Sequence, residues 1–203
     1  LVFSVIGMVV LQKEISISPK FNTAYIKDIV LNFGIPMIPA SIKSTVLTCT
    51  DRIFITNMES ISETGVYSVG NQFAMPILIL AQAFNLAFVP HLFSVLKKDD
   101  RYAKIKIVKF TYAYFFAIVF VSIAWTLFSK SILALIVGEE YHNAVQYIFW
   151  LSMGYAFTGM HMMVVNYIYY LKQVKIYAFI TIVVIIINII LNYFMITSYG
   201  SVG

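Results

Sequence analysis

The chain has 203 residues, of which 61% are hydrophobic and only 11% are charged. Soluble domains carry about 25% charged residues, so this composition excludes a soluble globular protein and indicates an integral membrane protein. The net charge of +5 does not indicate a nucleic-acid partner, because the cations gather in short stretches between apolar runs. Those runs suit transmembrane α-helices of about 20 residues.

Apolar runs and polar connectors alternate along the chain. Residues 1–11 are too short to span a bilayer, so we expect the end of a preceding transmembrane helix there, then a cytoplasmic connector over 12–27. A transmembrane bundle over 28–203 follows, with spans predicted at 28–58, 64–96, 107–128, 144–171 and 177–196. The sequence thus predicts an all-α polytopic membrane protein with about five full spans and one partial span. We expect a fragment of a longer protein, truncated at its C-terminus.

The charges of the connectors predict the orientation of these spans. Three basic stretches, 13–27, 97–109 and 172–175, hold three, six and two of the 14 Lys and Arg residues. The stretches between them, 51–63 and 129–142, hold five acidic residues and two basic ones. Loops rich in Lys and Arg face the cytoplasm, so we expect the basic stretches to be cytoplasmic and the acidic ones extracytoplasmic.

The first span carries a lone lysine, Lys43, among small and polar residues. Gly34, Pro36 and Pro39 precede it and should bend or break the helix, since proline lacks the backbone donor. A helix that begins near Ile29 would place Lys43 about 21 Å along its axis, too deep in a roughly 30 Å hydrocarbon layer for an end residue. An intramembrane charge usually faces a protein interior or a water-filled cavity and marks a functional site. Alternatively, Lys43 snorkels to the nearer surface or pairs with Asp51.

Three further spans each place polar residues on one helical face. At 100° per residue, such stripes are formed by Asn71, Gln82 and Asn85; by Ser152, Gly159 and Asn166; and by Thr181, Asn188 and Asn192. The stripes either line an aqueous pathway or form hydrogen bonds between helices. His161 lies opposite the Ser152 stripe, so we expect it to point away from such a cavity.

The sequence lacks the motifs of common enzymes and metal proteins. Cys49 is the single cysteine and is expected to pack as a small apolar residue, and the three histidines lack metal-ligand spacing. A P-loop, a nucleophile elbow and a dinucleotide fingerprint are all missing. We therefore expect no enzyme activity, no catalytic residue, no metal and no cofactor.

Four segments carry a resemblance to a known family. In chain order they read FGIPMIPASIKSTVLTCTDRIFI, ETGVYSVGNQFAMPILILAQAFNLAFVPHLF, GEEYHNAVQYIFWLSMGYAFTGM and INIILNYFMITSYGSVG. Together they resemble the polysaccharide biosynthesis export family, the O-antigen and teichuronic-type lipid-linked oligosaccharide flippases of the multidrug/oligosaccharidyl-lipid/polysaccharide exporter superfamily. The resemblance covers about 170 residues.

This resemblance implies a transporter of about twelve helices in two lobes, of which residues 28–203 would form most of the second. It implies translocation of an undecaprenyl-pyrophosphate-linked oligosaccharide across the cytoplasmic membrane of a bacterium or archaeon. We expect Lys43 to attract the pyrophosphate. The expected sugar contacts are Asn71, Gln82, Asn85, Asn188 and Asn192. Asp51 and Arg52 match the family's acidic-basic pair and either gate the outer mouth or anchor the helix end at the interface.

Other functions predict different sequence features. A multidrug or toxin exporter of the same superfamily is the main alternative, and it usually needs a buried carboxylate, for which Asp51 is the one candidate within the spans. A membrane-embedded polysaccharide polymerase or acyltransferase would need a long extracytoplasmic loop, and the loops here have about a dozen residues. A structural scaffold would leave Lys43 unexplained. The expected partners are the lipid-linked oligosaccharide, membrane lipids and a polysaccharide polymerase.

Overall fold

Five long α-helices make up almost all of the described chain. The computed structural model describes residue 27 and residues 30–98 and 100–202, so the predictions for residues 1–11 and most of 12–27 lie outside the described residues. The long helices are α3 (Ile35–Met58), α4 (Ile61–Lys97), α5 (Arg101–Ile136), α6 (Val145–Tyr170) and α7 (Val174–Tyr199). Short helical turns are η1 (Val30–Gly34), η2 (Glu139–Ala144) and η3 (Gly200–Val202). No strand occurs in this part of the chain, which confirms the all-α fold.

The proline-rich start of the first span changes helix type. A π-helical turn ends at Gly34, and α3 then begins with Pro36 in its first turn and continues through Pro39. Proline fits the first turn because the N–H that it lacks has no intrahelical partner there. The irregularity predicted for this region is therefore a switch from π to α geometry after Gly34, and the α-helix continues unbroken through Pro39.

Side-chain caps fix where two helices begin after tight turns. The Ser60 hydroxyl accepts the backbone N–H of Glu63 at 3.0 Å at the start of α4. The Asp100 carboxylate accepts the backbone N–H of Tyr102 at 2.9 Å at the start of α5. Each bond satisfies a donor that the first helical turn leaves free. These caps fix the first residues of α4 and α5 after the turns.

Four helical segments are long and apolar enough to cross a membrane. They are Ile61–Lys97, Arg101–Ile136, Glu139–Tyr170 and Val174–Tyr199. Many large apolar side chains on them are exposed, for example Phe116 at 79% and Leu135 at 85%. Such a surface suits hydrocarbon rather than water, and the protein is a multi-pass membrane protein. α3 is not among the four, since it contains Lys43, Asp51 and Arg52.

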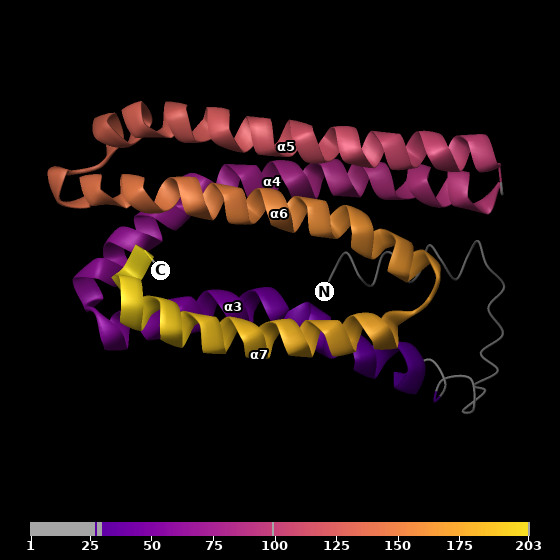
Figure 1. Cartoon of the computed structure of the whole chain (residues 1–203), viewed down its shortest axis with the longest axis horizontal. Helices are drawn as coiled ribbons and strands as arrows, with labels where there is room; N and C mark the ends of the chain where they lie inside the picture. The colour runs from indigo at the N-terminus through magenta and orange to yellow at the C-terminus, as the bar shows by residue number, and fades with distance from the viewer. Residues whose placement is uncertain (1–26, 28–29, 99, 203) are drawn as a thin grey trace, which may run out of the picture.

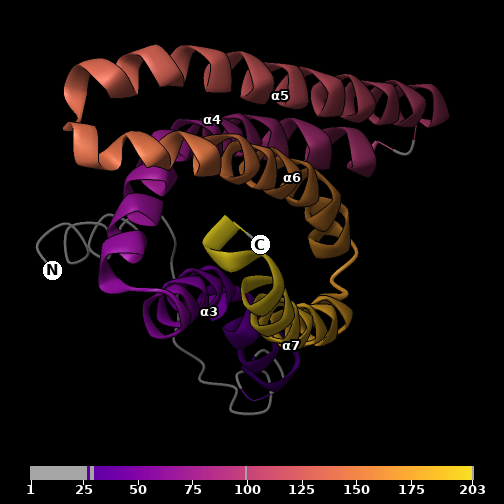
Figure 2. The ribbon, with the colours of Figure 1, turned by 60° about the vertical axis from the view of Figure 1, so that its left-hand side comes forward.

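The helices form two units. α4, α5 and α6 pack together as a three-helix unit, and α3 and α7 pack as a two-helix unit (Figure 1). α3 meets α4, and α6 meets α7, less extensively than the helices meet within each unit. Figure 2 shows α3 and α7 side by side below the other three helices. The two units are thus joined mainly through their connecting turns and one shared end.

The two ends of the bundle differ in charge. The acidic end holds the α3–α4 turn, η2 and η3, and lies at the left of Figure 1. The basic end holds the α4–α5 and α6–α7 turns. α4 and α5 have 37 and 36 residues, about 55 Å each at 1.5 Å per residue. They exceed a roughly 30 Å hydrocarbon layer, so their ends reach the head-group regions.

Close helix contact in the three-helix unit depends on glycine. A Cβ atom on Gly159 of α6 would lie 2.8 Å from the Cβ atom of Ala81 on α4 and 2.8 Å from the Tyr114 hydroxyl on α5. Small residues allow membrane helices to approach so closely. Around this contact lie the buried side chains of Ile77, Leu92, Ile118, Ala156 and Met163. The core of the unit is therefore centred on the α4–α6 interface.

Candidate functional site

A cluster of polar side chains joins the two units near the acidic end. The Asn192 amide of α7 donates to the Asp51 carboxylate of α3 at 2.7 Å and to the Asn188 side-chain oxygen at 3.3 Å. The Tyr67 hydroxyl of α4 donates to the other oxygen of Asp51 at 3.4 Å. We call Asp51, Tyr67, Asn188 and Asn192 the Asp51 cluster. It connects three helices, two from one unit and one from the other.

The Asp51 cluster borders a small cavity of about 210 Å³. Besides the four cluster residues, its lining includes Tyr147 and Trp150 of α6 and Ser201 of η3. The cavity thus lies where the start of α6 and the end of α7 meet the second half of α3. Its walls combine one carboxylate with several hydroxyl and amide groups, which are groups that bind sugar hydroxyls or water.

A second hydrogen-bond network closes the same end. The Tyr147 hydroxyl donates to the Glu63 carboxylate of α4 and shares a 2.5 Å hydrogen bond with the Ser201 hydroxyl. Ser201 also donates to Glu63 at 3.1 Å. The first turn of α4 is thereby bound to α6 and to η3. No sequence pattern predicted this role of Glu63, whose partners lie 84 and 138 residues away.

Lys43 of α3 has an electrostatic neighbour on α6. It is half-buried on α3 and close enough to His161 of α6 for the two groups to interact electrostatically. The His161 ring is 5.9 Å from the Tyr177 ring of α7. Lys43 does not pair with Asp51, which is eight residues away on the same helix, about 12 Å along the axis. The role of Lys43 toward a cavity, or by snorkelling to the surface, therefore stays a prediction.

The polar stripe of α6 faces the core of its own unit. Gly159 approaches α4 and α5, and the Asn166 amide donates to the Asn85 side-chain oxygen of α4 at 2.7 Å. Ser152, on the same stripe, is fully buried. His161, on the opposite face, lies toward α3 and α7. The expectation that His161 points away from a cavity lined by the polar stripes stays a prediction, because spacing separates two faces without saying which neighbour each one meets.

The polar residues of α4 take different positions. Asn71 is buried and accepts a 2.5 Å hydrogen bond from the Tyr155 hydroxyl of α6, and Asn85 is bonded to Asn166. Both therefore have the helix-packing role that the sequence left open. Gln82 is exposed on α4. The lining of the Asp51 cavity includes Asn188 and Asn192 but none of these three residues, and the assignment of all five to sugar contacts stays a prediction.

Arg52 and Cys49 are two exposed side chains of α3. Arg52 is exposed, yet it interacts electrostatically with Tyr67 of α4 and Tyr155 of α6. Its neighbour Asp51 is half-buried in the cluster described above. Cys49 is exposed, which differs from the packing role expected for it. Among the described residues, no group of three His, Cys, Asp or Glu side chains is placed to hold a metal ion.

Two comparisons with known proteins match most of the chain. A profile of the family described as "Polysaccharide biosynthesis protein" matches residues 1–146. The "Lsg locus putative protein 1" of Haemophilus influenzae (strain ATCC 51907 / DSM 11121 / KW20 / Rd) is 25% identical over 146 residues, which are 72% of this chain. The chain spans only 36% of the length of that relative. No solved structure matches the chain.

Proposed function

We propose, from the premise that this chain belongs to the polysaccharide biosynthesis protein family, that it moves a lipid-linked oligosaccharide across the cytoplasmic membrane. The cargo is a glycan on undecaprenyl pyrophosphate, and it crosses without covalent change. In this proposal the protein is a transporter and not an enzyme, and it delivers its cargo to a polysaccharide polymerase.

The position of Lys43 is the observation that carries the proposal. A pyrophosphate is anionic and does not enter hydrocarbon without compensation for its lost hydration. Lys43 is a half-buried cation on α3, within electrostatic range of His161 on α6, and in this proposal it faces the space between the two units. A cation at this depth stabilises an anion by a charge-assisted hydrogen bond.

The Asp51 cluster supplies the gate in this proposal. It joins α3 and α7 to α4 near the acidic end, together with the Glu63–Tyr147–Ser201 network. If the basic loops face the cytoplasm, the bundle is held together at its outer end. Movement of the two-helix unit away from α4 and α6 would open that end, as in transporters that rock two bundles about a central site.

The test is a substitution of Lys43 in the whole protein. Lys43→Ala should abolish surface glycan and leave lipid-linked oligosaccharide in the inner leaflet, while Lys43→Arg should retain transport. The matched control is Lys130→Ala, which removes an exposed lysine from α5. Membrane abundance should be equal in all variants. Normal glycan export by Lys43→Ala would contradict the proposal.

Export of a cationic drug or toxin is a second candidate function, and Asp51 favours it. Its carboxylate is half-buried inside the bundle, and such exporters couple transport to an intramembrane acid. Asp51→Asn should then abolish drug resistance while Lys43→Ala leaves resistance unchanged. If the protein is a flippase, Lys43→Ala should reduce glycan export more than Asp51→Asn does.

A further inference from the structure

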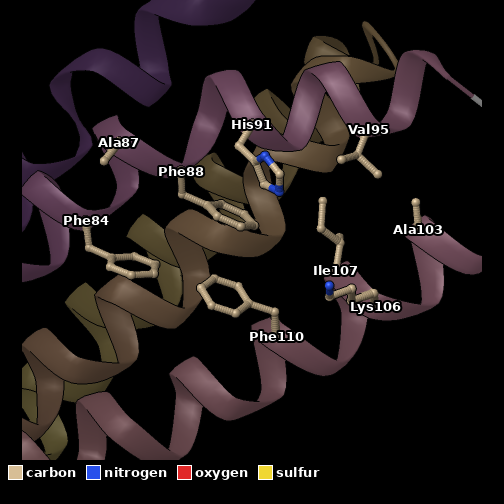
Figure 3. A pocket seen from close by; sticks show the side chains of 9 residues that line it. All are labelled: Phe84, Ala87, Phe88, His91, Val95, Ala103, Lys106, Ile107 and Phe110. Carbon is tan, nitrogen blue, oxygen red and sulfur yellow. The ribbon is translucent and has the colours of Figure 1, made fainter.

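α4 and α5 border a groove near the basic end of the bundle (Figure 3). Its volume is about 500 Å³, within the range of roughly 300–1,000 Å³ typical of small-ligand sites. We call it the α4–α5 groove, and its nine lining residues are Phe84, Ala87, Phe88, His91, Val95, Ala103, Lys106, Ile107 and Phe110. It shares no residue with the cavity at the Asp51 cluster.

The floor of the groove is aromatic and apolar. Phe88 and Ile107 are buried, with 6% and 4% of their surface exposed. The Phe110 ring of α5 stacks on Phe84 and Phe88 of α4, with ring centroids 6.0 and 5.5 Å apart. Apolar cavities do not hold ordered water, so a hydrocarbon group is the complementary ligand for this floor.

The length of the groove matches one leaflet of a bilayer. From Phe84 to Val95 it follows eleven residue steps of α4, about 16 Å at 1.5 Å per residue. Half of a roughly 30 Å hydrocarbon core is about 15 Å. The groove also opens beside the turn at Lys97, where the helices reach the head-group region. One acyl chain of the adjacent leaflet fits this depth.

The mouth of the groove carries one lysine and one histidine. His91 of α4 and Lys106 of α5 direct their nitrogen atoms toward it from opposite sides (Figure 3). Both side chains are exposed. Residues 97–109 hold six Lys or Arg residues against two Asp residues. Basic pockets between transmembrane helices attract anionic head groups, so a phosphate is the complementary group at this position.

We infer that the α4–α5 groove binds an anionic phospholipid of the surrounding membrane. One acyl chain lies along Phe84, Phe88 and Phe110, and the phosphate is held at Lys106 and His91. The site goes beyond the proposed transport of a glycan lipid and does not depend on Lys43. It makes the position of α5 on α4 sensitive to the lipid composition of the leaflet at the basic end.

The test measures lipid binding to the purified whole protein by native mass spectrometry. Phosphatidylglycerol and phosphatidylcholine with the same acyl chains are titrated separately. One cation near an anionic surface is worth about 1 kcal/mol, which is about a fivefold change in affinity. Lys106→Gln should therefore weaken phosphatidylglycerol binding about fivefold and leave phosphatidylcholine binding unchanged. Lys106→Arg should restore it.

Two further variants separate the groove from general attraction to the surface. Lys130→Gln removes an exposed cation from the other end of α5 and should leave phosphatidylglycerol binding unchanged. Ala103→Phe places a ring in the groove and should weaken binding of both lipids. Equal losses for Lys106→Gln and Lys130→Gln would overturn the inference, as would equal affinity of the unmodified protein for both lipids.

Competition identifies the occupant. Inorganic phosphate should fail to displace phosphatidylglycerol, because it lacks the chain that contacts the aromatic floor. Displacement by inorganic phosphate would show that only the anion is bound and would overturn the inference. Displacement by a polyprenyl phosphate at lower concentration than phosphatidylglycerol would assign the groove to the transport cargo, which also overturns it. Failure of transport by Lys43→Ala has no bearing on either result.

Discussion

Replacement of Gly159 by alanine tests whether the close approach of α6 to α4 and α5 stabilises the fold. The added Cβ atom would lie 2.8 Å from the Ala81 Cβ atom and 2.8 Å from the Tyr114 hydroxyl. The tyrosine can swing its end aside, but the Ala81 Cβ atom moves only with its backbone. Overpacking of this kind costs about 1–3 kcal/mol.

Gly154 on the same helix is the matched control, because a Cβ atom there would meet nothing within 4 Å. Both substitutions change helix propensity alike, by about 0.5–1 kcal/mol in favour of alanine. The free energy of unfolding of Gly159→Ala should thus be about 1–3 kcal/mol below that of Gly154→Ala. Reversible unfolding in mixed micelles measures both values. Equal stability of the two variants would refute the steric argument.

Three hydrogen bonds give further predictions in the same unfolding assay. A double-mutant cycle between Asn85→Ala and Asn166→Ala should give a coupling energy near 0.6 kcal/mol, the average for bonds between membrane helices; a value of zero would count against the 2.7 Å bond. Tyr147→Phe removes one donor from a carboxylate and should lower the free energy of unfolding by about 1.5–3 kcal/mol, whereas an unchanged value would mean that water replaces it. Asn192→Leu leaves the Asp51 carboxylate with Tyr67 alone and should cost about 1–3 kcal/mol; full stability would show that the Asp51 cluster does not join the helices.

Helical spacing in the sequence predicted faces but not neighbours. Ser152, Gly159 and Asn166 do share one face of α6, and His161 lies on the other. Which face meets α4 and which meets α3 depends on how the helices assemble, and no spacing within one helix contains that information. The sequence did contain one signal for the packing role of this stripe, which is Gly159 at its centre. A glycine within a membrane helix indicates a close contact with another helix rather than the wall of a water-filled cavity.

The contacts of the Asp51 cluster lie beyond the reach of a single sequence. Asp51 and Asn192 were both singled out as polar residues within spans, yet they are 141 residues apart. Their pairing follows from the packing of α3 on α7, which are not consecutive helices. The irregular start of α3, by contrast, was predictable, because glycine and proline act locally.

The sparse contact between the two units sets how easily they move. Ile55 of α3 and Ile196 of α7 join a buried apolar cluster with α4 and α6 at the acidic end. Elsewhere most helix–helix contact lies within each unit, and the turns at residues 59–60 and 171–173 are short. A rigid-body rotation of the two-helix unit about these turns would therefore expose little buried apolar surface outside the acidic end. It would also break few hydrogen bonds there. Two conformers separated by only a few kcal/mol are the expected outcome, and a ligand that prefers one of them by a comparable amount reverses their populations.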